Sequence, residues 1–159
     1  YVFEKHIAYN LLHAPDFAWL DGAKIFHLIR DPRAMIASYK NKYDEVSPIA
    51  DSYRVQRRLY EASPAPVVDA DDILKPPEPM LSALCAAIGI PFRKEMLAWK
   101  AGPRDSDGVW AEHWYDAVRA STGFKPYKER ALALSPDLEE LALSCADDYA
   151  FFHRRRLTV

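Results

Sequence analysis

Glycine is scarce in this sequence, which limits the kinds of phosphate-binding loop that it can contain. The five glycines stand far apart, at positions 22, 89, 102, 108 and 123. They form neither a Gly-x-Gly-x-x-Gly run nor a Gly-Lys-Ser/Thr run, the two patterns that wrap backbone N–H groups around nucleotide phosphates. The 159 residues therefore exclude a dinucleotide-binding fingerprint and a Walker-type loop.

Cysteine, long apolar runs and an excess of positive charge are also lacking. Cys85 and Cys145 stand in separate apolar helical patterns, so we expect buried free thiols and neither a disulfide nor a zinc site. No apolar run approaches the roughly 18 residues of a membrane span and nothing resembles a signal peptide, so we expect a soluble, cytoplasmic protein. A net charge of −2 argues against general nucleic-acid binding, and any anion must be met by a local cluster.

Strand-like and helix-like patterns alternate along the chain. Half of the residues are hydrophobic, enough for one domain with a genuine core. Strands are expected within 1–5, 24–29 and 66–70, and helices within 7–12, 33–43, 44–63 (with a start near Pro48), 80–88, 109–121 and 135–156. Gly89 would end the helix that starts at 80, and Ser135 would cap the last one. This order predicts the α/β class, with a mainly parallel sheet flanked by helices in a single domain spanning 1–159.

An apolar run ends abruptly in an arginine within FHLIRDPRAMIASYK, residues 26–40. Asp31 is a good N-cap, and Pro32 suits the first helical position because its missing N–H would have no partner there. The pattern predicts a buried strand that turns into a helix, with Arg30 at the bend. Ligands bind beyond the carboxyl ends of parallel strands, where helix N-termini present free N–H groups. We therefore expect an anion site at Arg30.

Ser38 extends this candidate site. It follows Asp31 by seven residues, close to two helical turns, so it faces the same way about 10 Å further along the helix. Arg30 would grip a phosphate bidentately, Ser38 would donate its hydroxyl, and the helix dipole would add attraction. From the residues alone a structural alternative stays open, in which Arg30 pairs with Asp31 and Ser38 allows a close helix contact.

The stretch HLIRDPRAMIASYK resembles the 3′-phosphate-binding motif of the sulfotransferases that use 3′-phosphoadenosine 5′-phosphosulfate (PAPS). In that motif a strand is followed by Arg-x-Pro-Arg, and a serine lies eight residues after the first arginine. Three other stretches resemble the family in the same order: VFEKHIAYNLL, VVDADDILKPPEPMLSALCAAIGIPF and HWYDAVRASTGFKPY. Some relatives carry names borrowed from branched-chain aminotransferases, but no pyridoxal-lysine signature is found here.

The resemblance implies a P-loop-NTPase-like sulfotransferase fold, PAPS as the cosubstrate and no metal. It maps the two 3′-phosphate ligands onto Arg30 and Ser38. It also implies His6 as the base that takes the acceptor's proton, and Lys5 as the cation at the bridging oxygen of the leaving phosphate. Lys125, in a late loop, would contact the 3′-phosphate. The acceptor would be a hydroxyl or amine on a small molecule, carbohydrate or lipid.

One part of the family pattern is missing, the 5′-phosphosulfate loop, a Pro-Arg-Ser-Gly-Thr-like turn after the first strand. In relatives it lies N-terminal to the point where this chain begins, and the chain opens at Tyr1 without an initiator methionine. We therefore expect an N-terminally truncated domain, whose activity by itself is in question. The loss of a strand would expose a sheet edge and allow self-association through it.

Two alternatives to a complete enzyme stay open. The first is a non-catalytic nucleotide-binding remnant, or a piece that acts only with the missing N-terminal segment. The second is a relative of the P-loop kinases, against which the absence of a Walker loop and of paired magnesium carboxylates argues.

Several singled-out positions have structural alternatives. Lys5 and His6 would then be ordinary polar residues near a strand end, and His13 is a reserve base. His27, inside a strand, is expected to be packed and hydrogen-bonded. Residues 69–72, DADD, are interpreted as helix caps and not as metal ligands. Trp110, Trp114 and Val118 repeat every four residues, which favours a core stripe over a lid or an acceptor wall.

Overall fold

Two short parallel strands form the sheet, β1 (His27–Ile29) and β2 (Val67–Asp69). The computed structural model describes residues 2–109, 111–129 and 131–159, with the backbone alone at residue 114. The strands pair in the register His27–Val67, Leu28–Val68 and Ile29–Asp69. The C-terminal stretch runs beside β2 on its other edge, where the N–H of Leu157 donates to the Val67 carbonyl at 2.8 Å.

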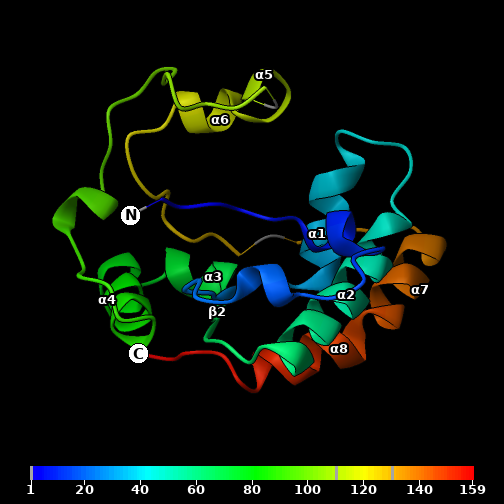
Figure 1. The fold of residues 1–159 in the computed structure, drawn as a ribbon. Helices are drawn as coiled ribbons and strands as arrows, with labels where there is room; N and C mark the ends of the chain where they lie inside the picture. Colours follow the sequence, from blue (N-terminus) through cyan, green and yellow to red (C-terminus); the bar gives the residue numbers. More distant parts are fainter. Residues whose placement is uncertain (1, 110, 130) are drawn as a thin grey trace.

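Helices surround this sheet (Figure 1). The longer ones are α1 (Pro32–Lys40), α2 (Pro48–Ala62), α4 (Pro77–Ala87), α7 (Pro136–Ser144) and α8 (Ala146–His153). The shorter ones are η1 (Ala8–Leu11), η2 (Ala18–Leu20), α3 (Ala70–Leu74), η3 (Lys94–Met96), α5 (Ala111–Trp114) and α6 (Asp116–Arg119). Within the described residues, no helix has the length and apolar character needed to cross a membrane. The chain thus combines many helices with a small parallel sheet.

The two faces of the sheet pack against different helices. On one face, Ile29 and Val67 are buried with Phe152 of α8. On the other face, Val68 is buried against Met80 and Leu84 of α4. The sheet therefore lies between α4 on one side and α8 on the other, as Figure 1 shows.

A separate apolar cluster holds α1, α2 and α7 together. Its buried members are Ile36, Val46, Ile49, Tyr53, Ala142 and Cys145. Ile36 of α1 is fully buried in it, so one face of α1 points into the core, while Ser38 on the opposite face is exposed. This cluster fixes where α1 begins relative to β1.

The outer edge of β1 is partly covered by a side chain. The N–H of His27 donates to the Pro66 carbonyl beside β2, so the alternation of a parallel strand turns the Leu28 carbonyl toward the outer edge. Nε2 of Gln56 donates to that carbonyl at 3.0 Å. Self-association through this edge stays a prediction.

Three sequence-based expectations about secondary structure are wrong. Residues 2–7 are exposed and form no strand, although the pattern of 1–5 is strand-like. The closing helix is not continuous but breaks at Cys145, where the Ser144 hydroxyl competes for the Leu141 carbonyl at 2.7 Å. Ser135 occupies the N-cap position of α7, yet its side chain makes no capping hydrogen bond.

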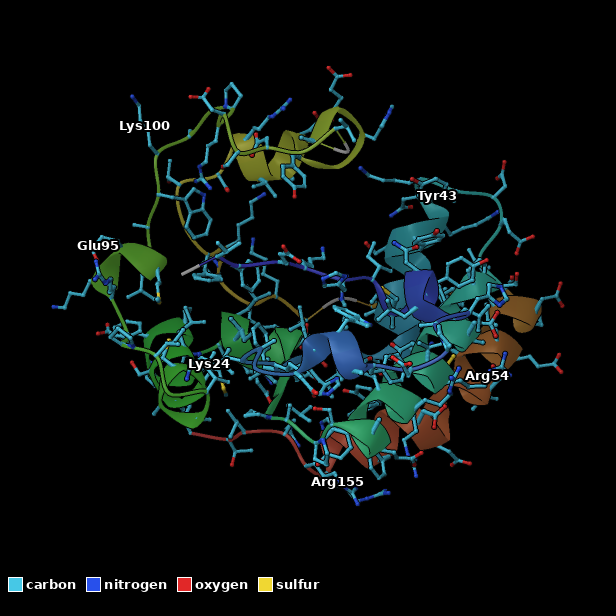
Figure 2. The ribbon with its side chains drawn as sticks, viewed as in Figure 1. Lys24, Tyr43, Arg54, Glu95, Lys100 and Arg155 are labelled. Carbon is cyan, nitrogen blue, oxygen red and sulfur yellow. The ribbon has the colours of Figure 1, made fainter. Side chains whose placement is uncertain are left out.

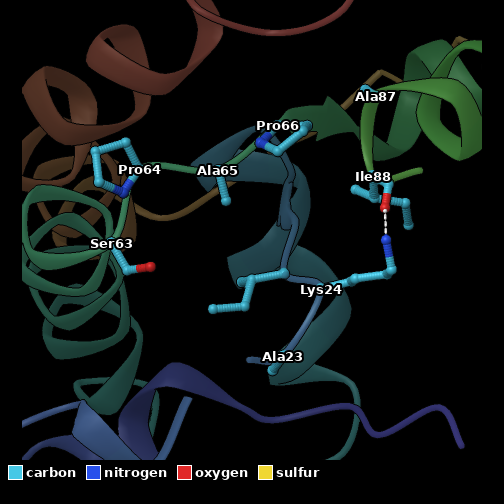
Figure 3. Close-up of a pocket in the computed structure, with 9 residues that line it drawn as sticks. Ala23, Lys24, Ser63, Pro64, Ala65, Pro66, Ala87 and Ile88 are labelled. Atoms are coloured by element: carbon cyan, nitrogen blue, oxygen red, sulfur yellow. Dashed lines mark hydrogen bonds between the residues drawn. The ribbon is translucent and has the colours of Figure 1, made fainter. Parts of the chain in front are cut away.

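The predicted end of α4 is confirmed. Gly89 has φ of +66°, a left-handed conformation that glycine adopts without a steric penalty, and the N–H of Ile90 donates to the Cys85 carbonyl at 2.9 Å. Lys24, from a distant part of the chain, binds carbonyl groups at this end of the helix. Its Nζ donates to the carbonyls of Ile88 and Gly89 at 2.8 and 3.1 Å. Lys24 and Ile88 line a small pocket of about 160 Å³, and Figure 3 shows the bond between them.

We expect Lys24→Met to lower the free energy of unfolding by about 1 kcal/mol, because it leaves carbonyls at the negative end of α4 without a charged donor. Urea denaturation measures the loss. Lys100→Met, which removes an exposed lysine from a loop, is the matched control and should change stability by less than about 0.5 kcal/mol. Equal losses in the two variants would show that the Lys24 hydrogen bonds contribute nothing specific.

Candidate functional site

The predicted strand-to-helix bend is confirmed in detail. Arg30 directly follows β1, and Asp31 is the N-cap of α1. Oδ1 of Asp31 accepts the N–H of Ala34 at 3.0 Å, and Pro32 occupies the first turn. The local sequence alone dictates this geometry, since a capping carboxylate and a proline favour helix initiation at the same residue.

Arg30 is half-buried at this bend, and its guanidinium has no hydrogen-bond or ion-pair partner among the described residues. Its backbone is held, because the hydroxyl of Tyr53 donates to the Arg30 carbonyl at 2.6 Å. The ion pair between Arg30 and Asp31, which the sequence left open as a structural alternative, is not formed within 4.0 Å in the described part of the chain. By contrast, Arg54 pairs with Asp51 and Arg155 bonds to the Phe151 carbonyl, both at the periphery (Figure 2).

A buried carboxylate lies across the sheet from this bend. Asp69, at the end of β2, is only 3% exposed and stands opposite Ile29 in the register. It accepts the Tyr149 hydroxyl and the N–H of Asp71, each at 2.9 Å. Both oxygens are thus engaged in hydrogen bonds within the protein.

The charges around the bend shift several protonation equilibria. Burial, followed by the charge of Asp69, raises the pKa of the Asp71 carboxyl, and the nearby positive charge of Arg30 opposes that rise. Burial and the hydrogen bond to Asp69 raise the pKa of Tyr149. Arg30 therefore lies close enough to Asp71 to influence it, without forming an ion pair within 4.0 Å in the described part of the chain.

Ser38 lies in α1 and is exposed. It is two residues from the fully buried Ile36, so it occupies the opposite side of the helix and not the core side. Its position, seven residues after the N-cap, places it about 10 Å along the axis from the start of α1. A joint role of Arg30 and Ser38 at one phosphate remains a prediction.

Lys5 and His6 lie on the exposed N-terminal stretch and not at a strand end. Nε2 of His6 is 3.3 Å from Oε2 of Glu4, and its ring lies 5.1 Å from that of Trp19. Among the described residues, no hydrogen bond or ion pair joins either side chain to Arg30. Their catalytic roles therefore stay predictions.

Lys125 is exposed in a loop whose preceding residues are firmly packed. Nε1 of Trp99 donates to the Ser121 hydroxyl at 2.9 Å, and Gly123 pairs with Ala98 in an antiparallel bridge. A Cβ added at Gly123 would lie 3.1 Å from the Leu97 carbonyl oxygen, a tight contact that the backbone would have to relieve by a shift of a few tenths of an ångström.

This loop forms one wall of an open pocket of about 390 Å³. The other wall is the start of α4, and the lining residues are Pro77, Glu78, Leu97, Ala98, Thr122, Gly123 and Phe124. Neither this pocket nor the one beside Lys24 is lined by Arg30 or Ser38.

The acidic turn after β2 has the structural role that the sequence predicts. Asp69 caps α3 by accepting the N–H of Asp71. Asp72 pairs with Arg156 at 2.7 Å and with Lys75 at 3.1 Å. Within 2–109, 111–129 and 131–159, no group of three or more His, Cys, Asp or Glu side chains is arranged to hold a metal ion.

The predicted tryptophan stripe falls largely outside the described residues, since Trp110 and the side chain of Trp114 are not among them. Val118, its third member, is 48% exposed on α6. At that position the expected burial is not found. The α5 and α6 segments lie away from the sheet in Figure 1.

Sequence reasoning missed two tyrosines that support the bend, Tyr53 and Tyr149. Both stand in apolar helical patterns, where a tyrosine is interpreted as a residue of the hydrophobic core. Their partners, Arg30 and Asp69, are 23 and 80 residues away along the chain. No local signal marks such a long-range hydrogen bond, although a buried tyrosine hydroxyl always needs a partner.

Comparison with known proteins gives a family for this mix of helices and a small parallel sheet. A family model described as a sulfotransferase domain matches residues 1–149. The chain therefore belongs to the sulfotransferase domain family. No solved structure matches it significantly.

Two curated relatives come from Arabidopsis thaliana. Branched-chain-amino-acid aminotransferase-like protein 1 is 35% identical over 137 residues, which cover 81% of this chain and 24% of the relative. Branched-chain-amino-acid aminotransferase-like protein 2 is 35% identical over 130 residues, which cover 78% of this chain and 23% of the relative. The chain thus spans about a quarter of the length of these relatives.

Proposed function

We propose that this chain is a PAPS-dependent sulfotransferase domain that holds the 3′-phosphate of the nucleotide with Arg30 and Ser38. Its reaction would transfer a sulfuryl group from PAPS to a hydroxyl or amine of a small molecule, carbohydrate or lipid. The observation that carries the proposal is the half-buried guanidinium of Arg30, which has no partner among the described residues.

Three physical features support an anion at this position. A partly buried guanidinium without a counter-ion is costly, and a bound phosphate would supply two parallel charged hydrogen bonds. The N-terminus of α1 adds the positive end of a nine-residue helix. Asp69, the most deeply buried carboxylate nearby, is already engaged by Tyr149 and the Asp71 amide.

In the proposed reaction the acceptor oxygen or nitrogen attacks the sulfur of PAPS in line with the bond to the 5′-phosphate. A new bond to sulfur forms, the sulfur–oxygen bond to the phosphate breaks, and adenosine 3′,5′-bisphosphate leaves. His6 would take the acceptor's proton, and Lys5 would stabilise the negative charge on the leaving phosphate oxygen. Lys125 would add positive charge near the 3′-phosphate.

A binding domain without catalysis is the second candidate. It is favoured by the position of Lys5 and His6, which lie on an exposed stretch and make no hydrogen bond or ion pair with Arg30 among the described residues. In that case the nucleotide would bind through its 3′-phosphate end, while sulfuryl transfer would need residues from elsewhere.

Isothermal titration calorimetry with adenosine 3′,5′-bisphosphate and adenosine 5′-monophosphate tests the proposal. We expect the bisphosphate to bind at least about 10-fold more tightly, because only it carries the phosphate that Arg30 would grip. Equal affinities would refute the 3′-phosphate site. A stronger response to ATP with magnesium would instead indicate a kinase relative. Turnover of PAPS with a phenolic acceptor then separates an enzyme from a binder.

A further inference from the structure

The carbonyl of Arg30 is held by a deeply buried hydroxyl. Tyr53 is 4% exposed and belongs to the apolar cluster that joins α1, α2 and α7. Its hydroxyl donates to the Arg30 carbonyl at 2.6 Å, a short bond for a neutral pair. Burial raises the pKa of this phenol, so the hydroxyl remains a donor at every physiological pH.

This hydrogen bond fixes the peptide group between Arg30 and Asp31. On one side, Ile29 is buried against Phe152, which fixes the end of β1. On the other side, Asp31 accepts the side-chain bond from the N–H of Ala34, and its carbonyl accepts the N–H of Met35 at 2.9 Å. The backbone is therefore held before, at and after Arg30.

The direction of the side chain follows from the same constraints. Ile29 points to the α8 face of the sheet, and Leu28, 49% exposed, points to the other face. Alternation along the strand turns Arg30 away from Ile29 and toward the side of Leu28. A guanidinium that leaves a fixed backbone in a fixed direction loses less entropy when it binds an anion.

We propose that Tyr53 is a positioning residue, which pre-organises Arg30 for a 3′-phosphate through the Arg30 carbonyl. The inference rests on the proposed function, because it assigns a role in the same phosphate site. Tyr53 itself would touch no ligand. Its loss should therefore weaken ligands that bear a 3′-phosphate and spare those that lack one.

The test compares wild type, Tyr53→Phe, Tyr60→Phe and Arg30→Ala by titration calorimetry with adenosine 3′,5′-bisphosphate and adenosine 5′-monophosphate. Tyr60 lies seven residues further along α2 and packs against His27 and Phe152, so its variant removes a hydroxyl from the same helix without reaching the bend. The measured quantity is the ratio of the two affinities. We expect Tyr53→Phe to lower this ratio about 5-fold, with the affinity for the monophosphate unchanged, and Tyr60→Phe to leave it unchanged.

The outcomes separate the two proposals. If Arg30→Ala lowers the ratio and Tyr53→Phe does not, the phosphate site stands and the positioning role of Tyr53 is refuted. If Tyr53→Phe weakens both nucleotides equally, the hydroxyl serves only stability, and the inference is again overturned. If wild type shows no preference for the bisphosphate, both proposals fail.

A second measurement covers the case in which Tyr53→Phe does not fold. In ¹⁵N-arginine spectra of the ligand-free wild type, the Nε–H of Arg30, assigned with Arg30→Lys, should give a sharp resonance distinct from those of exposed arginines. It should shift on addition of the bisphosphate. A resonance already averaged with the exposed arginines would show that Arg30 is not pre-organised, and would overturn the inference.

Discussion

Arg30→Ala should weaken the binding of adenosine 3′,5′-bisphosphate about 100-fold. The variant removes a bidentate, charged contact to a doubly negative phosphate, and charged hydrogen bonds contribute roughly 1.5–3 kcal/mol each. It should not unfold the protein, because the guanidinium has no hydrogen-bond or ion-pair partner among the described residues. Titration calorimetry measures the affinity, and thermal unfolding without ligand confirms that the fold is intact.

Three companion variants make this result specific. Arg30→Lys keeps the positive charge but cannot donate two parallel hydrogen bonds to one phosphate. We therefore expect a smaller loss of affinity, about 10-fold. Ser38→Ala removes one neutral donor and should cost about 3- to 10-fold. Arg33→Ala is the control: Nη2 of Arg33 lies 2.6 Å from Oε1 of Glu139, and binding should be unchanged. Equal affinities for all four variants and wild type would eliminate Arg30 and Ser38 as ligands of the phosphate.

The bend itself was predictable because its signals are local. Asp31 and Pro32 specify a helix start within two residues, and the apolar run before Arg30 specifies a buried strand. The same holds for the end of α4, where the left-handed Gly89 stops the helix. In each case the residues next to the helix terminus determine where the helix begins or ends. The terminus can therefore be predicted without knowledge of the tertiary fold.

Features that depend on distant partners were not predictable. The strand-like pattern at 1–5 is intrinsic, but a strand exists only where another strand accepts its hydrogen bonds, and residues 2–7 meet none in the described part of the chain. At the break of the closing helix at Cys145, the Ser144 hydroxyl and the Cys145 thiol both donate to the Leu141 carbonyl. The apolar periodicity of a sequence does not register a single hydrogen bond of this kind, so it predicts one continuous helix.

The candidate site shows the same division. The residue types at Arg30 and Ser38, and their spacing, could be read from the sequence as an anion site. The sequence could not show whether the Arg30 guanidinium forms an ion pair within the protein. That depends on which carboxylates the fold brings within reach of it. Asp69, for example, bonds to Tyr149, a residue 80 positions away, and Arg30 has no hydrogen-bond or ion-pair partner among the described residues.

A second large effect is expected at His27, whose burial should make the protein sensitive to acid. The imidazole is 3% exposed, and the rings of Tyr60 and Phe152 lie 5.4 and 5.6 Å from it. As expected, the histidine is packed and hydrogen-bonded, through the backbone of Ser63, while its Nε2 has no hydrogen-bond partner among the described residues. Burial lowers the pKa of His27 from 6.5 to about 4, partly opposed by a hydrogen bond with the backbone of Ser63.

The sign of the effect follows from this lowered pKa. The unfolded chain takes up a proton near pH 6.5, whereas the folded protein resists it until about pH 4. Stability is therefore complete above pH 6.5 and falls as the pH drops toward 4, by up to about 3 kcal/mol, at 1.36 kcal/mol per pH unit. Urea denaturation at intervals from pH 7.5 to 4.5 measures this loss.

His27→Gln isolates the contribution of this one group, because carboxylates that titrate in the same range are present in both proteins and cancel in the difference. The free energy of unfolding of wild type minus that of the variant should fall by about 2 kcal/mol between pH 7 and pH 5. If the variant does not fold, the imidazole resonances of wild type report the pKa directly. Parallel pH profiles, or a His27 resonance that titrates near 6.5, would show that the imidazole accepts a proton in the folded state at little cost, and that burial between Tyr60 and Phe152 does not keep it neutral.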